Sequence, residues 1–300
     1  MHDNPVKPVI QEDGYPYLPS SIFSTSSGTP YLRTPGVHLI ARPSVSLASM
    51  GEFLGGYDSS LGFESYQNDP DTLPAGTELC KTAGQLCYMS FAPRRTMNAD
   101  ASRYFQNIKM SGHGSVLEHA SFSFLIYGIS RSVTHELVRH RAGFAFSQVS
   151  QRYCSGRIVR FVERTEYVQD PWLHARFEER IDRAAADYED IANHLLIRQK
   201  AGSEILSAEM KTDLRKKVQQ AARSLLPNET EAPIMVTANA RAWRHFIEMR
   251  ASSQAEVEIR ALAFKIYQCL FSIEPILFED YSEVSLPDGT WAVATASRKV

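Results

Sequence analysis

Apolar residues at helical spacing dominate the second half of the chain and limit what it can fold into. Asp170 followed by Pro171 is typical of a helix start, because aspartate caps free backbone N–H groups and proline suits the first turn. An apolar stripe then continues to Leu195, which corresponds to about six helical turns. Two more stripes of the same period end at Pro227 and Pro275. The pattern predicts a helix-rich protein.

Short strand-like segments lie between the expected helices. Residues 37–41, 122–126 and 233–237 are apolar or alternate between apolar and polar side chains. Further helices are expected near Glu78 and over residues 98–110. A few short strands among many helices predict an α+β fold, with one helix-rich domain and a small, mostly antiparallel sheet.

The first part of the chain has neither a helical nor an alternating period. Residues 1–35 are rich in Pro, Ser, Gly, Thr and Tyr, and we expect an extended or loosely ordered arm there. Residues 51–74 also have a loop-like composition. We therefore expect a single catalytic domain over residues 36–300.

Charge, cysteine content and hydropathy narrow the classes of function. The formal net charge of -2 gives no general attraction to nucleic acid or to anionic membranes, so we expect neither as a partner. No apolar stretch approaches the roughly 20 residues needed to span a bilayer, and the first residues do not resemble a signal peptide. The four cysteines form no C-x-x-C pair. These features favour a cytoplasmic protein with reduced thiols.

The most informative segment is 131–153, where basic and polar side chains follow an apolar helix. Residues 139–141, Arg-His-Arg, stand at the expected end of that helix, where each cation is favoured by about 0.3–1 kcal/mol. Helix-end electrostatics does not explain the second polar group, Ser-Gln-Arg at 150–152. Arginine offers a planar fork of donors for phosphate oxygens, whereas Ser and Gln suit a sugar hydroxyl or a pyrimidine edge. Together the two groups indicate a nucleotide site.

A zinc-protease helix is the competing interpretation of the same segment. That motif needs two histidines four residues apart, whereas His135 and His140 are five apart. They would lie about 140° apart around a helix and could not share one metal ion. We therefore expect no metal site.

The string Arg139-His140-Arg141, eight residues and Ser150 resembles the motif of the flavin-dependent thymidylate synthases, which is Arg-His-Arg, seven or eight residues, then Ser. Residues 112–119, 222–227 and 239–241, with His245 and Arg250 following, resemble the same family. Four segments in family order make a specific match, which covers the chain from about residue 37 to about residue 278.

The resemblance implies a homotetramer with shared active sites that methylates dUMP to dTMP, using FAD, 5,10-methylenetetrahydrofolate (the folate) and NADPH. It implies that FAD contacts Ser115, Arg139, His140, Arg141, Gln148, Asn239, Ala240, Arg241 and His245. It implies that dUMP contacts Glu136, Leu137, Val138, Arg139, Gln148, Val149, Ser150, Gln151, Arg152, Arg223 and Arg250. Among these, Arg250 would be catalytic, because it matches the arginine that favours ionisation of the pyrimidine at N3. A fixed guanidinium stabilises negative charge as it builds up on the ring.

Several residues have a plainer interpretation beside the functional one. Ser115 and Glu118 have capping-box spacing, and Arg94 and Arg95 resemble a solvated loop pair. Cys80 and Cys87 are expected to be small core thiols, and Cys154 a structural thiol.

Two other functions remain open. A nucleotide- or RNA-binding protein without catalysis would use the arginines for phosphate and Phe144, Phe146 and Tyr153 for stacking. Steep salt dependence of binding would distinguish RNA from a mononucleotide. A flavoprotein NADPH oxidase is the other alternative, but it would not require Arg250 or residues 150–152.

Overall fold

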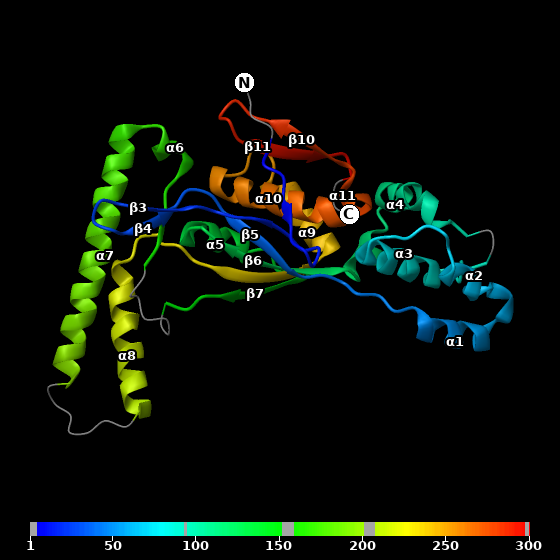
Figure 1. The fold of residues 1–300 in the computed structure, drawn as a ribbon, viewed down its shortest axis with the longest axis horizontal. Helices are drawn as coiled ribbons and strands as arrows, with labels where there is room; N and C mark the ends of the chain where they lie inside the picture. The colour runs from blue at the N-terminus through cyan, green and yellow to red at the C-terminus, as the bar shows by residue number, and fades with distance from the viewer. Residues whose placement is uncertain (1–4, 93–94, 152–158, 201–207, 298–299) are drawn as a thin grey trace.

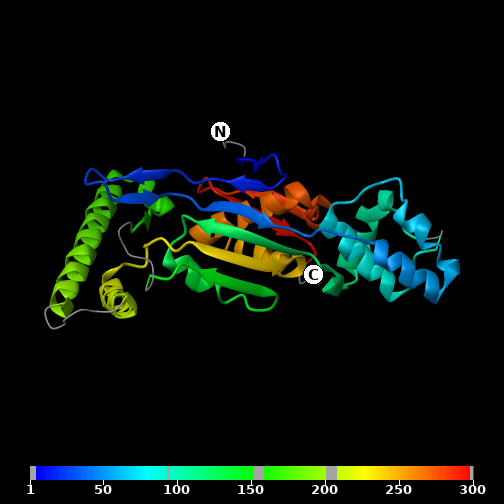
Figure 2. The ribbon, with the colours of Figure 1, turned by 60° about the horizontal axis from the view of Figure 1, so that its bottom comes forward.

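A six-stranded antiparallel sheet forms the centre of the molecule (Figure 2). In spatial order its strands are β1 (Val9–Ile10), β2 (Pro16–Leu18), β5 (Gly36–Ala41), β6 (Ser121–Tyr127), β9 (Ile234–Asn239) and β7 (Phe144–Gln148). This computed structural model describes residues 5–92, 95–151, 159–200, 208–297 and 300. The strands expected at 37–41, 122–126 and 233–237 are confirmed.

Helices α9 (Ala240–Arg250) and α10 (Val257–Ile273) cover one face of this sheet (Figure 1). Alternation along β6 sends Phe122 and Phe124 into the core beneath them. The Trp243 ring meets Phe124 edge-on at 5.3 Å, and its indole N–H donates to the Phe122 carbonyl at 3.2 Å. The apolar period of α10 therefore matches a buried face, as its sequence predicts.

A helical hairpin stands at one end of the sheet, on the left of Figure 1. It consists of α7 (Pro171–Lys200) and α8 (Ala208–Ala222), followed by the short 3₁₀ helix η4 (Arg223–Leu225). Asp170 Oδ1 accepts the N–H groups of Trp172 and Leu173 at 2.9 and 3.1 Å, which confirms the predicted helix start. Beside the hairpin lie α6 (Thr165–Val168) and a small sheet of β3 (Ile22–Ser24), β4 (Pro30–Leu32) and β8 (Phe161–Val162), in which β4 and β8 run parallel.

A second lobe lies at the opposite end (Figure 1). Its elements are α1 (Ala48–Tyr57), η1 (Ser59–Leu61), α2 (Phe63–Gln67), α3 (Ala75–Cys87), η2 (Asn98–Asp100) and α4 (Ala101–Met110). The loop expected over 51–74 is thus largely helical. Phe63 and Tyr66 pack edge-on against buried Phe91, and this contact stabilises helices that their own short sequences do not predict.

Two single-residue expectations in this lobe were wrong. Arg95 is buried rather than solvated, because its guanidinium donates to Ser65 O at 2.9 Å and to Asp69 Oδ2 at 3.1 Å. Arg94 lies outside the described residues. Cys80 is a buried core thiol, but Cys87 is exposed, because it is the last residue of α3 and follows the helix out of the core.

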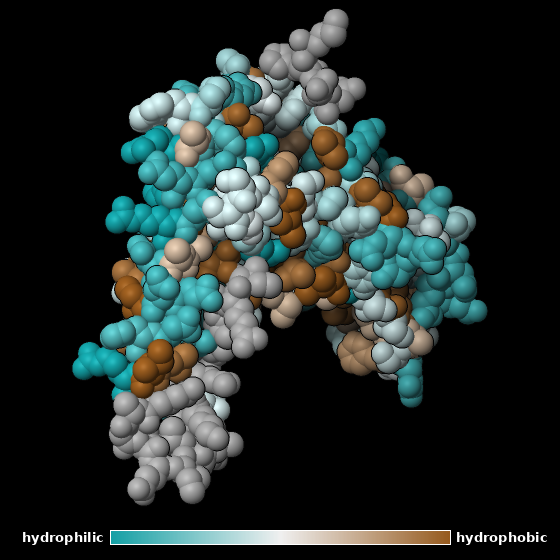
Figure 3. All heavy atoms as spheres, turned by 60° about the vertical axis from the view of Figure 1, so that its left-hand side comes forward, coloured by the Kyte–Doolittle hydropathy of each residue, from teal (hydrophilic) through white to brown (hydrophobic). Residues whose placement is uncertain are grey.

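The remaining elements are η3 (Gly114–Glu118), α5 (Arg131–Leu137), α11 (Pro275–Phe278) and a hairpin of β10 (Tyr281–Ser285) and β11 (Trp291–Thr295). The fold is the expected helix-rich α+β arrangement. Figure 3 shows apolar residues gathered where the surface is hollowed between the helical hairpin and the opposite lobe. Within the described residues, no helix is long and apolar enough to cross a membrane.

Candidate active site

Helix α5 places the basic motif, and it ends earlier than its sequence period suggests. Ser130 Oγ accepts the Val133 N–H at 3.3 Å and begins the helix, which stops at Leu137. Residues 139–141 were expected to end this helix, but they lie in the turn beyond it. The chain must reverse there to enter β7, and it does so with Phe144 N donating to Arg141 O at 3.2 Å.

The end of α9 meets this turn and brings Arg250 to it. Arg250 Nη1 lies 2.7 Å from Glu136 Oε2, and Arg250 Nε donates to His140 Nε2 at 3.1 Å. No described residue accepts a hydrogen bond from the third guanidinium nitrogen, Nη2. The structure thus joins three residues that were assigned separately to dUMP and to FAD.

His140 is held as a neutral imidazole. Burial, together with the nearby charge of Arg250, lowers its pKa from 6.5 to about 4. Because Nε2 accepts from Arg250, the ring proton resides on Nδ1. The rings of Phe246 and His245 lie at centroid distances of 5.2 and 5.9 Å from it. His140 therefore offers an N–H donor whose direction is fixed.

A second group of predicted residues gathers at the start of α9. Asn239 Oδ1 accepts the Ala242 N–H at 2.8 Å, so Asn239 is the N-cap of the helix. Gly143, at φ +76°, packs so tightly that an added Cβ would meet the Asn239 amide nitrogen and Ala242 Cβ at 2.9 Å. Sequence reasoning missed this glycine, although a glycine in the extended motif was a signal for it.

Arg241 and η3 complete this group. Arg241 Nη1 pairs with Glu118 Oε1 at 2.6 Å, and Ser115 lies exposed on η3. The capping-box interpretation of Ser115 and Glu118 was wrong, because η3 begins without a side-chain cap and Glu118 reaches to Arg241 instead. Glu118 is a contact that the sequence spacing did not reveal.

The donors in this region fit an anionic dinucleotide such as FAD. Arg139 and Arg141 are exposed, Arg241 is half-buried, and Asn239 caps the N-terminus of α9, which Arg241 follows directly. Guanidinium groups and a helix N-terminus are the groups that bind pyrophosphate where no glycine-rich turn is present.

The other predicted residues form a separate cluster near the opposite end of β9. Gln148 pairs with Ile234, and Val149 N donates to Pro233 O at 2.9 Å, so Ser150 and Gln151 lie beyond that end. Asn239 closes the other end, which is about 17 Å away at 3.3–3.4 Å per strand residue. One chain therefore does not gather all the predicted residues into one place.

Arg223 opens η4, directly after α8, rather than lying within that helix. Arg152 lies outside the described residues, as do Tyr153 and Cys154. Leu137 and Val138, both predicted to contact dUMP, differ in exposure: Leu137 is buried in the core, and Val138 is exposed.

Comparison with known proteins identifies the family. The family model described as thymidylate synthase complementing protein matches residues 71–276. A flavin-dependent thymidylate synthase of Mycolicibacterium gilvum is 43% identical over 221 residues, which cover 74% of this chain and 85% of that protein. The Mycobacterium tuberculosis H37Rv enzyme of the same name is 44% identical over 223 residues, with the same coverage. Because the match spans most of both chains and the whole site, the chain belongs to the flavin-dependent thymidylate synthase family.

Proposed function

We propose that Arg250, held by Glu136 and His140, is the catalytic arginine of this enzyme. As a flavin-dependent thymidylate synthase, the chain is a methyltransferase that converts dUMP to dTMP. FAD is its cofactor, 5,10-methylenetetrahydrofolate its carbon donor and NADPH its reductant. The observation that carries the proposal is the fixed guanidinium, which keeps Nη2 without a hydrogen-bond acceptor among the described residues.

The chemistry explains why a fixed cation is needed. Carbon C5 of uracil becomes nucleophilic only as negative charge builds up on the ring. A guanidinium that is already oriented stabilises this charge without reorganising during the reaction. Glu136 and His140 orient Arg250 through Nη1 and Nε and leave Nη2 for the pyrimidine. FAD, when bound, supplies the redox chemistry and relays the one-carbon unit.

We propose that the remaining motif residues bind the two nucleotides. Ser115, Arg139, His140, Arg141, Gln148, residues 239–241 and His245 would hold FAD. Residues 136–139, 148–152, Arg223 and Arg250 would hold dUMP. The charge of Arg141 and the neutral N–H of His140 suit the polar edge of a flavin, and Arg223 suits the phosphate of dUMP.

We also propose a homotetramer in which subunits share each active site. Two features support this assembly. The predicted ligand residues form two clusters separated by the length of β9, and an active site shared with a second subunit would unite them. Leu125 and Met235, which are paired neighbours on the sheet face opposite α9 and α10, are 41% and 43% exposed. Light scattering after size exclusion tests this, and a catalytically active monomer would refute it.

The chain divides into an N-terminal arm and a catalytic domain in this proposal. We propose that residues 36–300 form the catalytic domain and residues 1–35 an arm that extends along it in the cytoplasm. The hydrogen bonds between β2 and β5 support the contact between arm and domain.

Release of tritium from C5 of labelled dUMP tests the reaction directly. We expect release that requires the folate and NADPH and is lost when FAD is removed. Release without FAD would exclude the flavin mechanism. Absence of release from protein that binds both FAD and dUMP would instead indicate a different flavin reaction.

A further inference from the structure

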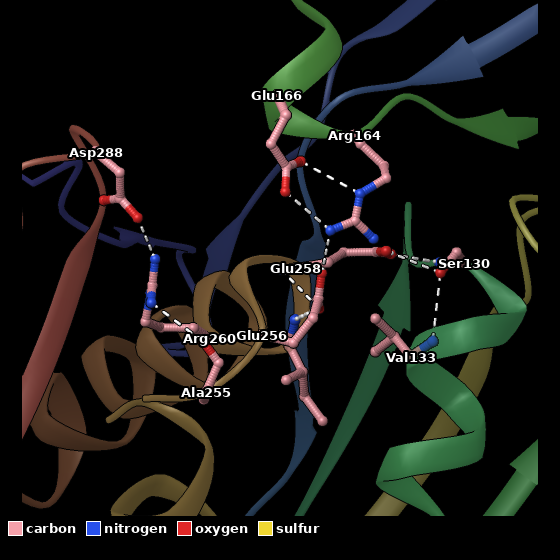
Figure 4. Close-up of polar contacts among 10 residues, drawn as sticks. Ser130, Val133, Arg164, Glu166, Ala255, Glu256, Glu258, Arg260 and Asp288 are labelled. Atoms are coloured by element: carbon pink, nitrogen blue, oxygen red, sulfur yellow. Dashed lines mark hydrogen bonds and ion pairs between the residues drawn. The ribbon is translucent and has the colours of Figure 1, made fainter. Parts of the chain in front are cut away.

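Helix α10 has a glutamate at each end, half-buried Glu258 and buried Glu274, and each binds the N-terminus of a different helix. Near its start, Glu258 accepts the Ser130 N–H at 2.6 Å and the Ser130 hydroxyl at 2.8 Å (Figure 4). At its C-cap, Glu274 accepts the N–H groups of Gly76 and Thr77 at 2.7 and 2.8 Å and the Thr77 hydroxyl at 2.7 Å. The two carboxylates thus bind similar donors, Glu258 at the start of α5 and Glu274 at the start of α3.

The Glu258 contact acts on the helix that carries the motif. Ser130 is 3% exposed, and its oxygen accepts from Val133 N while its hydroxyl proton points to Glu258. Helix α5 has only 7 residues, too few to be stable by itself, so its anchored first turn fixes its position. Glu136 lies on the next turn, and His140 follows shortly after it.

The start of α10, which carries Glu258, is itself held in place by hydrogen bonds. Glu256 caps α10 by accepting the N–H groups of Glu258 and Ile259, and its other oxygen binds Arg164 at 2.6 Å (Figure 4). Arg260 donates to the carbonyls of Ser253 and Ala255, both at 3.2 Å. These carbonyls belong to the segment between α9 and α10, which directly follows Arg250. The network therefore joins both sides of the Arg250–Glu136 contact.

The cavity beside this network has no room for a substrate. Its volume is about 40 Å³, and Arg164, Glu163 and Glu258 are among the residues that line it. A site for a nucleotide or a folate needs roughly 300 Å³ or more. The half-buried Glu258 therefore binds groups of the protein itself rather than a substrate in this cavity.

We propose that Glu258 is a positioning residue of the thymidylate synthase reaction. It fixes the first turn of α5 against α10, and thereby holds Glu136 and His140 against Arg250. The proposal rests on the catalytic role proposed for Arg250. It adds a residue that contacts neither nucleotide.

Three variants of the FAD-loaded enzyme test the proposal. Glu258→Ala removes both acceptors from Ser130, and Glu274→Ala is the matched control because it removes the same kind of cap from α3. Glu258→Gln should restore function, because its amide oxygen accepts the Ser130 N–H and its amide nitrogen donates to Ser130 Oγ. We expect both alanine variants to lower the melting temperature. Only Glu258→Ala should also reduce kcat by tenfold or more, with Glu258→Gln within about threefold of the parent.

A second readout does not depend on turnover. NMR of ¹³C-labelled histidine follows the titration of His140, assigned with a His140→Asn sample. In Glu258→Ala, the His140 pKa should rise from about 4 toward its ordinary value of 6.5, because Arg250 and the packed rings move away. In Glu274→Ala it should stay near the parent value.

The outcomes are separable. If Glu258→Ala loses stability but keeps the parent kcat and His140 titration, Glu258 is only structural and the proposal fails. If Glu258→Ala does not fold, Ser130→Ala is the substitute: it removes the hydroxyl contact with Glu258 and the cap on Val133 N, keeps the Ser130 N–H bond to Glu258, and should give the same changes at smaller size. If Arg250→Ala is fully active, the role proposed for Arg250 fails, whereas the His140 titration still reports whether Glu258 positions α5.

Discussion

Arg250 Nε donates a hydrogen bond to His140 Nε2 across 3.1 Å, although 110 residues separate the two in the sequence. This contact fixes the protonation state of the histidine and two of the three nitrogens of the guanidinium, since Glu136 holds the second. The histidine of the Arg-His-Arg motif and the distant Arg250 therefore belong to one hydrogen-bonded group.

Arg250→Ala should leave the fold and bound FAD intact and reduce dTMP formation by about 10²–10³-fold, the usual effect of removing an oriented charge-stabilising group. Arg250→Lys should recover little of this, because a lysine cannot bind Glu136 and His140 together. Tritium release and the flavin absorbance band measure the two effects. Full activity in Arg250→Ala would falsify the catalytic assignment.

Acidification should destabilise the protein partly through His140. Its pKa is about 4 in the folded chain and 6.5 ordinarily, so between these values the unfolded chain binds a proton that the folded chain does not. The contribution of neutral His140 to the unfolding free energy is fully present above pH 6.5 and declines as the pH falls toward 4. Urea titrations give the unfolding free energy at each pH. Between about pH 7 and pH 5, this free energy should fall less for His140→Asn than for the parent. An equal loss in both proteins would contradict this.

Gly143→Ala should destabilise the fold by about 1–3 kcal/mol, since it forces an alanine into a left-handed conformation and against Asn239. It should also weaken FAD binding several-fold, because Asn239 is a proposed FAD ligand. Gly28→Ala is the control. Gly28 has φ +90° in the β3–β4 turn, with nothing within 4 Å of an added Cβ. Its stability should fall without a change in FAD affinity, and equal FAD losses in the two variants would refute the Asn239 contact.

Thiol reactivity should follow burial. Cys87 is exposed, whereas burial raises the pKa of both Cys80 and Cys269 to about 12. In a Cys154→Ser background, which we expect to remain active, a disulfide reagent should modify the native enzyme quickly at one thiol. Adding Cys87→Ser should abolish that phase, and a remaining fast phase would place a buried thiol within reach of solvent.

The sequence correctly predicted the elements whose pattern is local. The capped start of α7 at Asp170, the alternation of β6 and the period of α10 all appear in the structure. These succeed because burial of one face imposes a period on the residues themselves. The motif spacing also gave the family without reference to any contact.

Elements stabilised by distant partners were missed or misplaced. Helix α2 depends on Phe91, β7 on pairing with β9, and the burial of Arg95 on Asp69. The predicted helix end at residues 139–141 failed because the reversal into β7, rather than local charge, ends α5. In each case the deciding contact is long-range, and local propensity carries no information about it.

By itself, the sequence determined the family of this protein and predicted which residues carry its chemistry, because an ordered set of arginines, histidine, serine and asparagine at family spacing suits nucleotide ligands. Only the tertiary structure decided how they act on one another: that Arg250 is held by Glu136 and His140, that Glu118 binds Arg241, and that Glu258 anchors α5. The physical reason is that hydrogen bonds and ion pairs act over about 3 Å. Residues more than a hundred positions apart reach that distance only when packing of the sheet and helices brings them together.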